Sequence, residues 1–290
     1  MNVIGLNFNK REAGLELSFR ETLQKLDCQY KSVHAANIVI SLVAGTASVF
    51  DKGLLLSFDN TKIFFRGRGK QQHMTSLLIR LFKHQNIPIY GSMAGAEFTH
   101  NDGKITQMVD LTLAKLPIPN TLIFSKDSLD DLAEIALTSK FEFPLVLKKT
   151  GSKGAHVWKV NTIEEVRSLV LEAEIGELYI LQEYIPNTFD IRALYFHGNF
   201  LGAIARHSKD GFYNNVSLGA FADTIELTEE ENILAKQACV VLQQNFAGVD
   251  IVRSARGPLF FEVNNRPGYQ GFEAATGISV GEQIARLLVE

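Results

Sequence analysis

The first hundred residues alternate between short apolar runs and longer amphipathic stretches. The apolar runs predict strands at VIGLNF (3–8), NIVISL (37–42), KIFFRG (62–67) and IPIYG (87–91). Apolar positions that recur every three to four residues predict a helix around 11–26 and another at TSLLIRLFKHQN, 75–86. Alternation of this kind predicts a small parallel sheet with helices on its faces.

Strands become more frequent after this region. A helix at GKITQMVDLTLAK (103–115) is stopped by the prolines at 117 and 119, and a second helix covers 127–139. Further elements are predicted at NTLIF (120–124), FPLVLKK (143–149), HVWKV (156–160), a helix opening NTIEEV (161–166), YILQEYI (179–185), DIRALYF (190–196), NFLGAIAR (199–206), a helix over 228–244, the hairpin GVDIV…LFFEV (248–263) and a helix near 281. No clear linker interrupts this series, and we place domain boundaries near residues 96 and 183.

Composition and charge exclude several classes of protein. Hydrophobic residues make up 46% of the 290 residues and charged residues 21%, which indicates a soluble globular protein rather than a disordered one. The net charge of −3 gives no general attraction to nucleic acid or anionic membrane. The two cysteines, Cys28 and Cys239, cannot form a disulfide framework, and the longest apolar stretch, NIVISLVAG, is too short to span a bilayer. We therefore expect a cytoplasmic protein without a nucleic-acid or membrane partner.

The segment GVDIVRSARGPLFFEVN (248–264) reads as one hairpin whose two strands each carry a carboxylate. A three-residue turn, 255–257, ends in a glycine suited to positive φ and pairs Ser254 with Pro258. Counting inward from that pair places Asp250 opposite Glu262. A two-residue turn would instead place the two carboxylates on opposite faces.

Facing carboxylates repel each other unless a proton or a cation lies between them. Asn264 lies two residues beyond Glu262 and so on the same face. Carboxylate and amide oxygens are the hard ligands that Mg²⁺ prefers, and phosphates often complete its shell. The alternative is a solvated hairpin face. A zinc site is disfavoured because no His or Cys cluster lies nearby.

Groups that could bind phosphate occur in FPLVLKKTGSKGAHV (143–157). Lys148 and Lys149 end a strand, and Gly151 and Gly154 follow in a loop through which backbone N–H groups could approach an anion. The loop is not a Walker A motif, because it lacks GxxxxGK[ST] and leads into another strand. A plain Gly-rich turn with exposed lysines stays an alternative.

The segment YILQEYIPNTFDIR (179–192) offers a second nucleotide contact. Its proline, Pro186, frees a backbone edge that could hydrogen-bond an adenine ring. Asp190 and Arg192 share one face of the following strand, and the planar guanidinium could hold a developing acyl phosphate. An exposed Asp–Arg pair is the alternative, and such a pair would contribute little to stability.

From about Lys104 onward the chain resembles the RimK-type carboxylate–amine ligases of the ATP-grasp superfamily. The matching blocks are LVLK, the Gly loop, QEYI…DIR, AGVDIVRS…GPLFFEVN and PGYQGFEAATGI, in the family's order and spacing. The resemblance implies an α/β (α+β) ATP-grasp fold of three lobes, with ATP between two antiparallel sheets. These would be a small N-terminal α/β domain (1–96), a central subdomain with the Gly loop (97–182) and a C-terminal subdomain with the magnesium site (183–290).

The resemblance also implies a role for individual residues. The implied catalytic residues are Arg192, Lys148 and Asn215. The implied nucleotide-binding residues are Lys104, Lys148, Gly151, Ser152, Gly154, Gln182, Glu183, Tyr184, Ile185 and Asp190, with Glu183 to Ile185 at the adenine. The implied metal ligands are Asp250, Glu262 and Asn264, with Glu262 bridging two Mg²⁺ ions and Mn²⁺ as an alternative metal. Arg266, Arg206 and Arg66 are candidates for contacting the substrate.

The sequence departs from the family around the substrate. The segment GFYNNVSLGA corresponds to one that in familiar members reads more like FRSNLHRGG. Asn215 and Gly219 match, whereas Tyr213, Ser217 and Leu218 replace two arginines and a histidine. Arg266 also replaces a residue that is often small. These departures leave the identity of the substrates open.

The expected activity is ATP-dependent ligation. ATP would convert a carboxylate to an acyl phosphate, and an amine would displace the phosphate to leave an amide, ADP and phosphate. The partners would be small-molecule or peptide carboxylates and amines, and a homo-oligomer stays open. Alternatives are a ligase that cross-links side chains of a precursor peptide, an ATP-grasp phosphotransferase and a nucleotide-binding regulatory module. Nucleic-acid binding through FFRGRGKQQH (64–73) is disfavoured by the net charge of −3.

Overall fold

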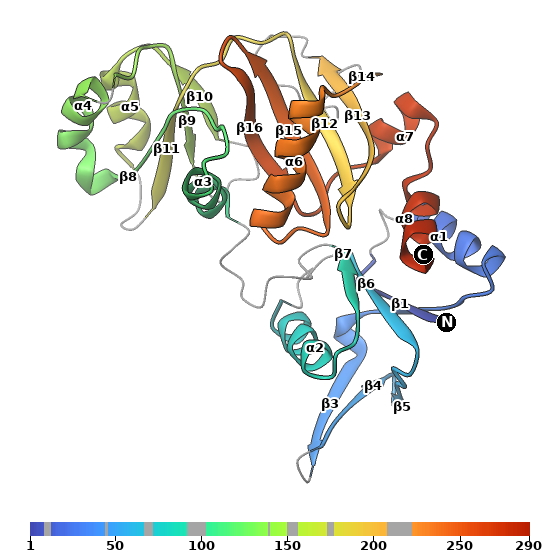
Figure 1. Ribbon diagram of the computed structural model, residues 1–290. Helices are drawn as coiled ribbons and strands as arrows, with labels where there is room; N and C mark the ends of the chain where they lie inside the picture. Colours follow the sequence, from blue (N-terminus) through green and yellow to red (C-terminus); the bar gives the residue numbers. More distant parts are fainter. Residues whose placement is uncertain are drawn as a thin grey trace.

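The computed structural model describes residues 1–8, 13–43, 46–66, 72–91, 103–138, 140–149, 156–172, 177–207 and 222–290. Within these ranges the strands form four sheets, shown in Figure 1. No helix of the described ranges is long and apolar enough to cross a membrane. The expected cytoplasmic location and the domain boundaries stay predictions.

The N-terminal region contains the predicted parallel sheet, with strand order β2-β1-β6-β7. Its elements are β1 (Asn2–Leu6), α1 (Ala13–Lys25), β2 (Gln29–Val33), β6 (Thr61–Phe65), α2 (Gln72–His84) and β7 (Ile89–Gly91). The apolar pattern does not predict β2, since only Val33 of its five residues is buried. Hydrogen bonding to β1 joins this edge strand to the sheet, and Tyr30 and Val33 supply its apolar contacts.

The run NIVISL does not join the parallel sheet. It forms an antiparallel arm with the next segment, made of β3 (Ile38–Val43), β4 (Thr46–Asp51) and β5 (Leu54–Leu55) after the 3₁₀ turn η2 (Ala35–Asn37). The arm extends away from the rest of the molecule in Figure 1. Val39, Leu54 and Leu55 are exposed on it, so apolar character alone does not reveal the sheet to which a strand belongs.

The central region is a four-stranded antiparallel sheet of order β10-β9-β11-β8. Its elements are α3 (Lys104–Leu113), β8 (Thr121–Ser125), η3 (Lys126–Ser128), α4 (Leu129–Thr138), β9 (Leu145–Lys149), β10 (Val157–Val160), α5 (Ile163–Val170) and β11 (Leu178–Glu183). The Thr162 hydroxyl accepts a hydrogen bond from the N–H of Glu165 and so caps α5. The strand-to-strand connection expected around the Gly loop is confirmed, because β9 pairs with β10.

The C-terminal region is a five-stranded antiparallel sheet of order β14-β13-β12-β15-β16. Its elements are β12 (Phe189–Phe196), β13 (Asn199–His207), β14 (Ala222–Thr224), α6 (Glu229–Val241), β15 (Phe246–Ser254), β16 (Gly257–Asn264), α7 (Gln270–Thr276) and α8 (Val280–Val289). Helix α6 starts at a capping box in which Thr228 and Glu231 satisfy each other's backbone N–H. Strand β16 is the edge of the sheet nearer to α3 (Figure 1).

The last helix, α8, returns to the N-terminal region. Helix α8 packs beside α1 in Figure 1, and a Cβ atom at Gly281 would lie 2.5 Å from the carbonyl oxygen of Leu15. Only glycine allows this close approach. Beneath the helices, Phe64 of β6 packs on Phe196 of β12 with ring centroids 5.8 Å apart. The N-terminal sheet and the C-terminal sheet therefore share one buried hydrophobic cluster.

Candidate active site

The two carboxylates of the hairpin face each other as predicted, but the turn is different. Ser254 pairs with Gly257, so the turn has two residues. A β-bulge then inserts Phe261 between the pairs Ile251–Phe260 and Asp250–Glu262, and the extra residue restores the alignment of the carboxylates. The predicted three-residue turn is wrong, whereas the predicted pairing of Asp250 with Glu262 is confirmed.

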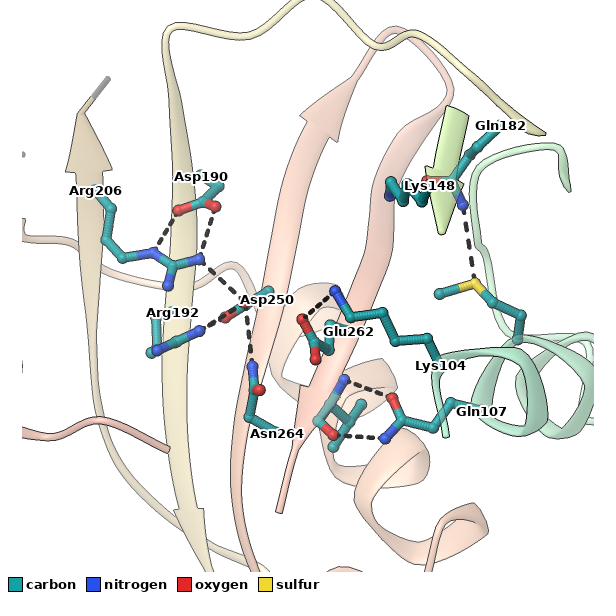
Figure 2. Close-up of polar contacts among 12 residues, drawn as sticks. Lys104, Gln107, Lys148, Gln182, Asp190, Arg192, Arg206, Asp250, Glu262 and Asn264 are labelled. Carbon is teal, nitrogen blue, oxygen red and sulfur yellow. Dashed lines mark hydrogen bonds and ion pairs between the residues drawn. The ribbon is translucent and has the colours of Figure 1, made fainter. Parts of the chain in front are cut away.

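Asp250 is the centre of a buried cluster of charges (Figure 2). Arg192 donates to its two oxygens from Nε at 2.8 Å and from a terminal nitrogen at 2.7 Å. Arg206 contacts it at 3.1 Å, and the Asn264 amide donates to it at 3.3 Å. Burial by itself would raise the pKa of Asp250, but the two arginines outweigh burial and lower it. Asp250 is therefore ionised, and the two arginines neutralise its charge.

Arg206, expected at the substrate, lies instead between two carboxylates. Its guanidinium donates to both oxygens of Asp190, at 2.6 and 2.7 Å, and its side chain is only 5% exposed. The pairing crosses from β13 to β12, where Arg206 is directly opposite Asp190. Burial raises the pKa of Asp190, and Arg206 opposes that shift. Arg206 thus joins the expected nucleotide-side acid, Asp190, to the expected metal ligand Asp250.

Glu262 faces a cation from a different element. Lys104, the first residue of α3, lies 3.2 Å from its carboxylate, and both side chains are partly exposed. Asp250, Glu262 and Asn264 thus place two carboxylates and an amide on one face of a hairpin, each carboxylate beside a basic side chain. Among the described residues no group of three His, Cys, Asp or Glu side chains could hold a metal. The oxygen donors fit Mg²⁺, which commonly uses one or two protein carboxylates together with phosphates and water.

Lys148 approaches the same face from the central sheet. Its ammonium donates to the Gln182 side-chain oxygen at 2.6 Å and lies 5.4 Å from the centre of the Phe261 ring. Burial, followed by repulsion from Lys104, lowers the pKa of Lys148 to about 8, although Glu262 acts in the opposite direction. A lysine with this pKa is ready to take up a proton when an anion such as a phosphate arrives.

The expected adenine-binding residues, Glu183 to Ile185, lie at the end of β11 and directly after it. The Glu183 carboxylate accepts a hydrogen bond from the backbone N–H of Asn120 at 2.8 Å and pairs with Arg256 in the hairpin turn. Lys159 lies 3.9 Å from the centre of the Tyr184 ring. The Glu183 side chain is therefore engaged in joining the central sheet to the C-terminal hairpin.

Arg66 and Arg266 lie in different environments. Arg66 is 2% exposed, donates to the Pro267 carbonyl at 3.1 Å and lies 5.0 Å from the centre of the Phe246 ring. It supports the loop that follows the expected metal ligands and is not on the surface. Arg266, one residue earlier in that loop, is exposed and so could meet a substrate.

Several expected site residues lie outside the described ranges. These are Gly151, Ser152, Gly154 and Asn215, together with Arg68, Lys70, Tyr213, Ser217, Leu218 and Gly219. Their roles stay predictions.

The roles of Gln107 and Arg256 are not evident from the sequence. Gln107 is three residues after Lys104 on α3 and binds the backbone of Val263, between the expected ligands Glu262 and Asn264. Helical spacing could have placed Gln107 on the same face as Lys104. Nothing in the sequence shows which strand that face contacts.

The geometry can now be compared with known proteins. The family model for the RimK-like ATP-grasp domain matches residues 101–288. The chain belongs to the RimK-like ATP-grasp family. A probable alpha-L-glutamate ligase from Aeromonas salmonicida (strain A449) is 41% identical over 151 residues, which are 50% of this chain and 50% of that protein. Another, from Syntrophotalea carbinolica, is 31% identical over 222 residues, 73% of this chain and 70% of that protein.

The fold of this RimK-like ATP-grasp protein is similar along its whole length to that of a solved ligase. The ATP-grasp ligase PsnB, in complex with a phosphomimetic variant of its minimal precursor, Mg and ADP, superposes with a TM-score of 0.75 at 15% identity, over 99% of this chain and 97% of that one. The predicted family, the ATP-grasp fold and the class of ATP-dependent ligase are thereby confirmed. ATP and Mg²⁺ are supported as the cofactors, while the number of ions stays a prediction.

Proposed function

We propose that the protein is an ADP-forming carboxylate–amine ligase that adds an amino acid, glutamate in the first instance, to a small molecule, peptide or protein. The observation that carries this proposal is the row of charges along the C-terminal sheet. Asp250 faces Glu262 across the hairpin, Arg192 lies beside Asp250, and Lys148 reaches the same face from the central sheet. The names of the relatives, probable alpha-L-glutamate ligases, support glutamate as the first candidate.

Asp250, Glu262 and Asn264 are the residues that would hold magnesium. When bound, the metal supplies positive charge to the outer phosphates. Lys104 and Lys148 would contact those phosphates, Lys104 by moving from its present position 3.2 Å from Glu262. Lys148 would do so in its protonated form.

Arg192 would act at the reacting groups. Its guanidinium is bound to Asp250 in the structure and would turn to the oxygens of the acyl phosphate. A substrate carboxylate oxygen attacks the γ-phosphorus, and ADP leaves. The amine then attacks the carbonyl carbon, phosphate leaves and the amine loses a proton. A planar, permanently charged guanidinium suits both the phosphate and the developing oxyanion. Asn215 is a further catalytic candidate.

Two other activities use the same fold. Cross-linking of precursor side chains is one, since PsnB was solved with a precursor, but 15% identity supports the fold alone. Phosphotransfer is the other. A regulatory nucleotide-binding module would have no catalytic activity. The paired carboxylates with Lys148 and Arg192 nearby support catalysis over binding alone.

The test is a screen for ADP release with Mg-ATP over amino acids, short acidic peptides and small dicarboxylates, followed by the mass of the product. We expect ADP and phosphate to form in equal amounts with an amide product. AMP and pyrophosphate would contradict the acyl-phosphate mechanism, and a phosphorylated product without an amide would indicate phosphotransfer. Absence of turnover with every acceptor would favour the regulatory module.

A further inference from the structure

Helix α3 lies along the open edge of β16, and one of its side chains completes that edge. Gln107 is 3% exposed and faces Val263. The Val263 N–H donates to the Gln107 side-chain oxygen at 3.1 Å, and the Gln107 amide nitrogen donates to the Val263 carbonyl at 2.9 Å. The glutamine amide thus makes both hydrogen bonds that a neighbouring strand would make with that residue.

The two hydrogen bonds to Gln107 are important because of the position of Val263 in the strand. Val263 lies between Glu262 and Asn264, so a rotation of its two peptide planes would turn both side chains. On the other side of the bulge, the Phe260 N–H donates to the Pro117 carbonyl at 2.8 Å. Hydrogen bonds therefore fix the strand on both sides of the bulged residue Phe261. Gln107 makes the hydrogen bonds on the side of the expected metal ligands.

The same helix reaches the phosphate side of the site. Lys104 pairs with Glu262, and one turn later the Met108 sulfur lies 3.9 Å from the Gln182 amide nitrogen. Gln182 in turn binds Lys148 at 2.6 Å. Figure 2 shows Gln107 next to Lys104 and Glu262, on the side away from Lys148.

We propose that Gln107 is a positioning residue of the magnesium site, which sets the directions of Glu262 and Asn264 by fixing the backbone between them. The inference rests on the proposed assignment of these two residues as metal ligands. Residues that orient metal ligands typically change metal affinity by 10–100-fold when replaced. Gln107 acts here through the main chain rather than through the ligand side chains.

The experiment is Gln107→Met, which keeps the length of the side chain and removes both hydrogen bonds. ADP binding is titrated by calorimetry at increasing Mg²⁺ concentrations. The readout is the Mg²⁺ concentration at which the increase in ADP affinity is half-maximal. We expect this concentration to rise by about 10–100-fold. ADP affinity without metal should change by less than about twofold, and turnover should recover at high Mg²⁺, which a merely damaged fold would not show.

Hydrogen exchange provides a readout that needs no ligand. In the ligand-free variant, the Val263 amide should exchange faster, because its hydrogen-bond acceptor is gone. Gln244→Met is the matched control, since Gln244 is also a buried glutamine of the C-terminal region and its side-chain oxygen makes no hydrogen bond among the described residues. The control should leave both the Mg²⁺ dependence and the exchange of Val263 unchanged.

Two further variants separate the possible failures. Gln107→Leu also removes both hydrogen bonds without adding a charge, so it should shift the Mg²⁺ dependence in the same direction, and it decides the question where the Met variant does not fold. If Glu262→Gln raises the half-effect concentration while both Gln107 variants leave it within twofold of wild type, the positioning role is overturned and the metal site stands. If Glu262→Gln has no effect either, the metal assignment and the inference fail together.

Discussion

On one side the C-terminal sheet meets the N-terminal region through aromatic rings. On the other side Leu111 and Leu116 join its apolar cluster, but the face that carries the carboxylates meets α3 and the central sheet through charges and amides. Phe64 lies within 6.4 Å of the ring centres of Phe196 and Phe246, and all three side chains are buried. The other border contains the pairs Lys104–Glu262, Gln107–Val263 and Arg256–Glu183. A close-packed apolar border loses dispersion and hydrophobic energy when it opens, whereas polar contacts can be exchanged for contacts with water or a ligand.

The difference indicates that the two borders have different roles, one in stability and the other in ligand binding. The aromatic border joins the N-terminal domain and the C-terminal sheet into one unit that supports the carboxylates. The polar border is where nucleotide and metal would bind, and the contacts that neutralise Asp250 and Glu262 there are the ones a ligand must replace. We expect changes at the first border to alter stability and changes at the second to alter binding and turnover.

The largest effect is expected from Phe64→Ala at the aromatic border. Removing a fully buried phenylalanine should lower the free energy of unfolding by about 3–5 kcal/mol, because burial is lost and a cavity remains. Denaturant titration measures this loss. Nucleotide affinity of the folded fraction should stay near that of wild type, and a large loss of affinity with unchanged stability would reverse the roles assigned to the two borders.

At the polar border, Glu262→Gln should reduce turnover by at least ~10²-fold with little change in the free energy of unfolding. The variant keeps the shape of the side chain and removes a negative charge from the expected metal site, and losses of this size follow removal of a principal electrostatic contact. Steady-state kinetics at saturating Mg²⁺ is the measurement. Activity near that of wild type would show that Glu262 is only a polar residue of the strand.

Arg266→Ser tests the exposed rim of the same border. If Arg266 binds the carboxylate of the acid substrate, the KM for that substrate should rise by roughly 10–100-fold, the effect of losing a charge-assisted contact. The KM for ATP and the melting temperature should hardly change. A fall in melting temperature with both KM values unchanged would make Arg266 structural.

The smallest effect concerns the protonation of Lys148. Its pKa of about 8 in the ligand-free protein should rise when phosphates bind, because they favour the charged form. ADP affinity should therefore be constant below pH 8 and fall by up to about tenfold per pH unit above it. Calorimetry at pH 8.5 in two buffers of different ionisation enthalpy should show proton uptake on binding, and Lys148→Met should show none from this group.

The same lysine also predicts the pH dependence of the ligand-free fold. The unfolded chain binds the Lys148 proton up to its ordinary pKa of 10.5, whereas the folded protein releases it at about 8. The unfolded state thus holds more protons between these values, so this group makes the free energy of unfolding rise from pH 8 to pH 10.5. Comparison of wild type with Lys148→Met isolates the contribution.

How far the sequence predicts the site is best seen at the hairpin. The pairing of Asp250 with Glu262 could be predicted, yet the predicted turn was one residue too long and the bulge at Phe261 was not anticipated. The two deviations cancel. The alternation of side chains predicts which residues lie on the same face of a strand. The position of a β-bulge, however, depends on the neighbouring elements that pack against the strand.

The arginines show a second limit of the sequence. Arg192, Arg206 and Arg66 look alike in sequence, and the structure places Arg66 and Arg206 in buried environments. Burial of a guanidinium depends on partners from distant strands, as with Asp190 and Asp250 around Arg206. The parallel sheet and most helices could be predicted because their apolar periodicity is local, whereas β2 could not because its residues are largely polar.

The packing of α8 on α1 has a consequence for biosynthesis. Lys62 of β6 donates to the carbonyl of Leu288 at 2.6 Å, and Phe19 and Phe64 belong to the same cluster as Ile284 and Leu288. During translation the N-terminal strands are made before α8, and their apolar surface is only partly covered until α8 has been made. The N-terminal strands are thus synthesised well before the helix that completes their cover, and in the interval part of their aromatic surface stays exposed.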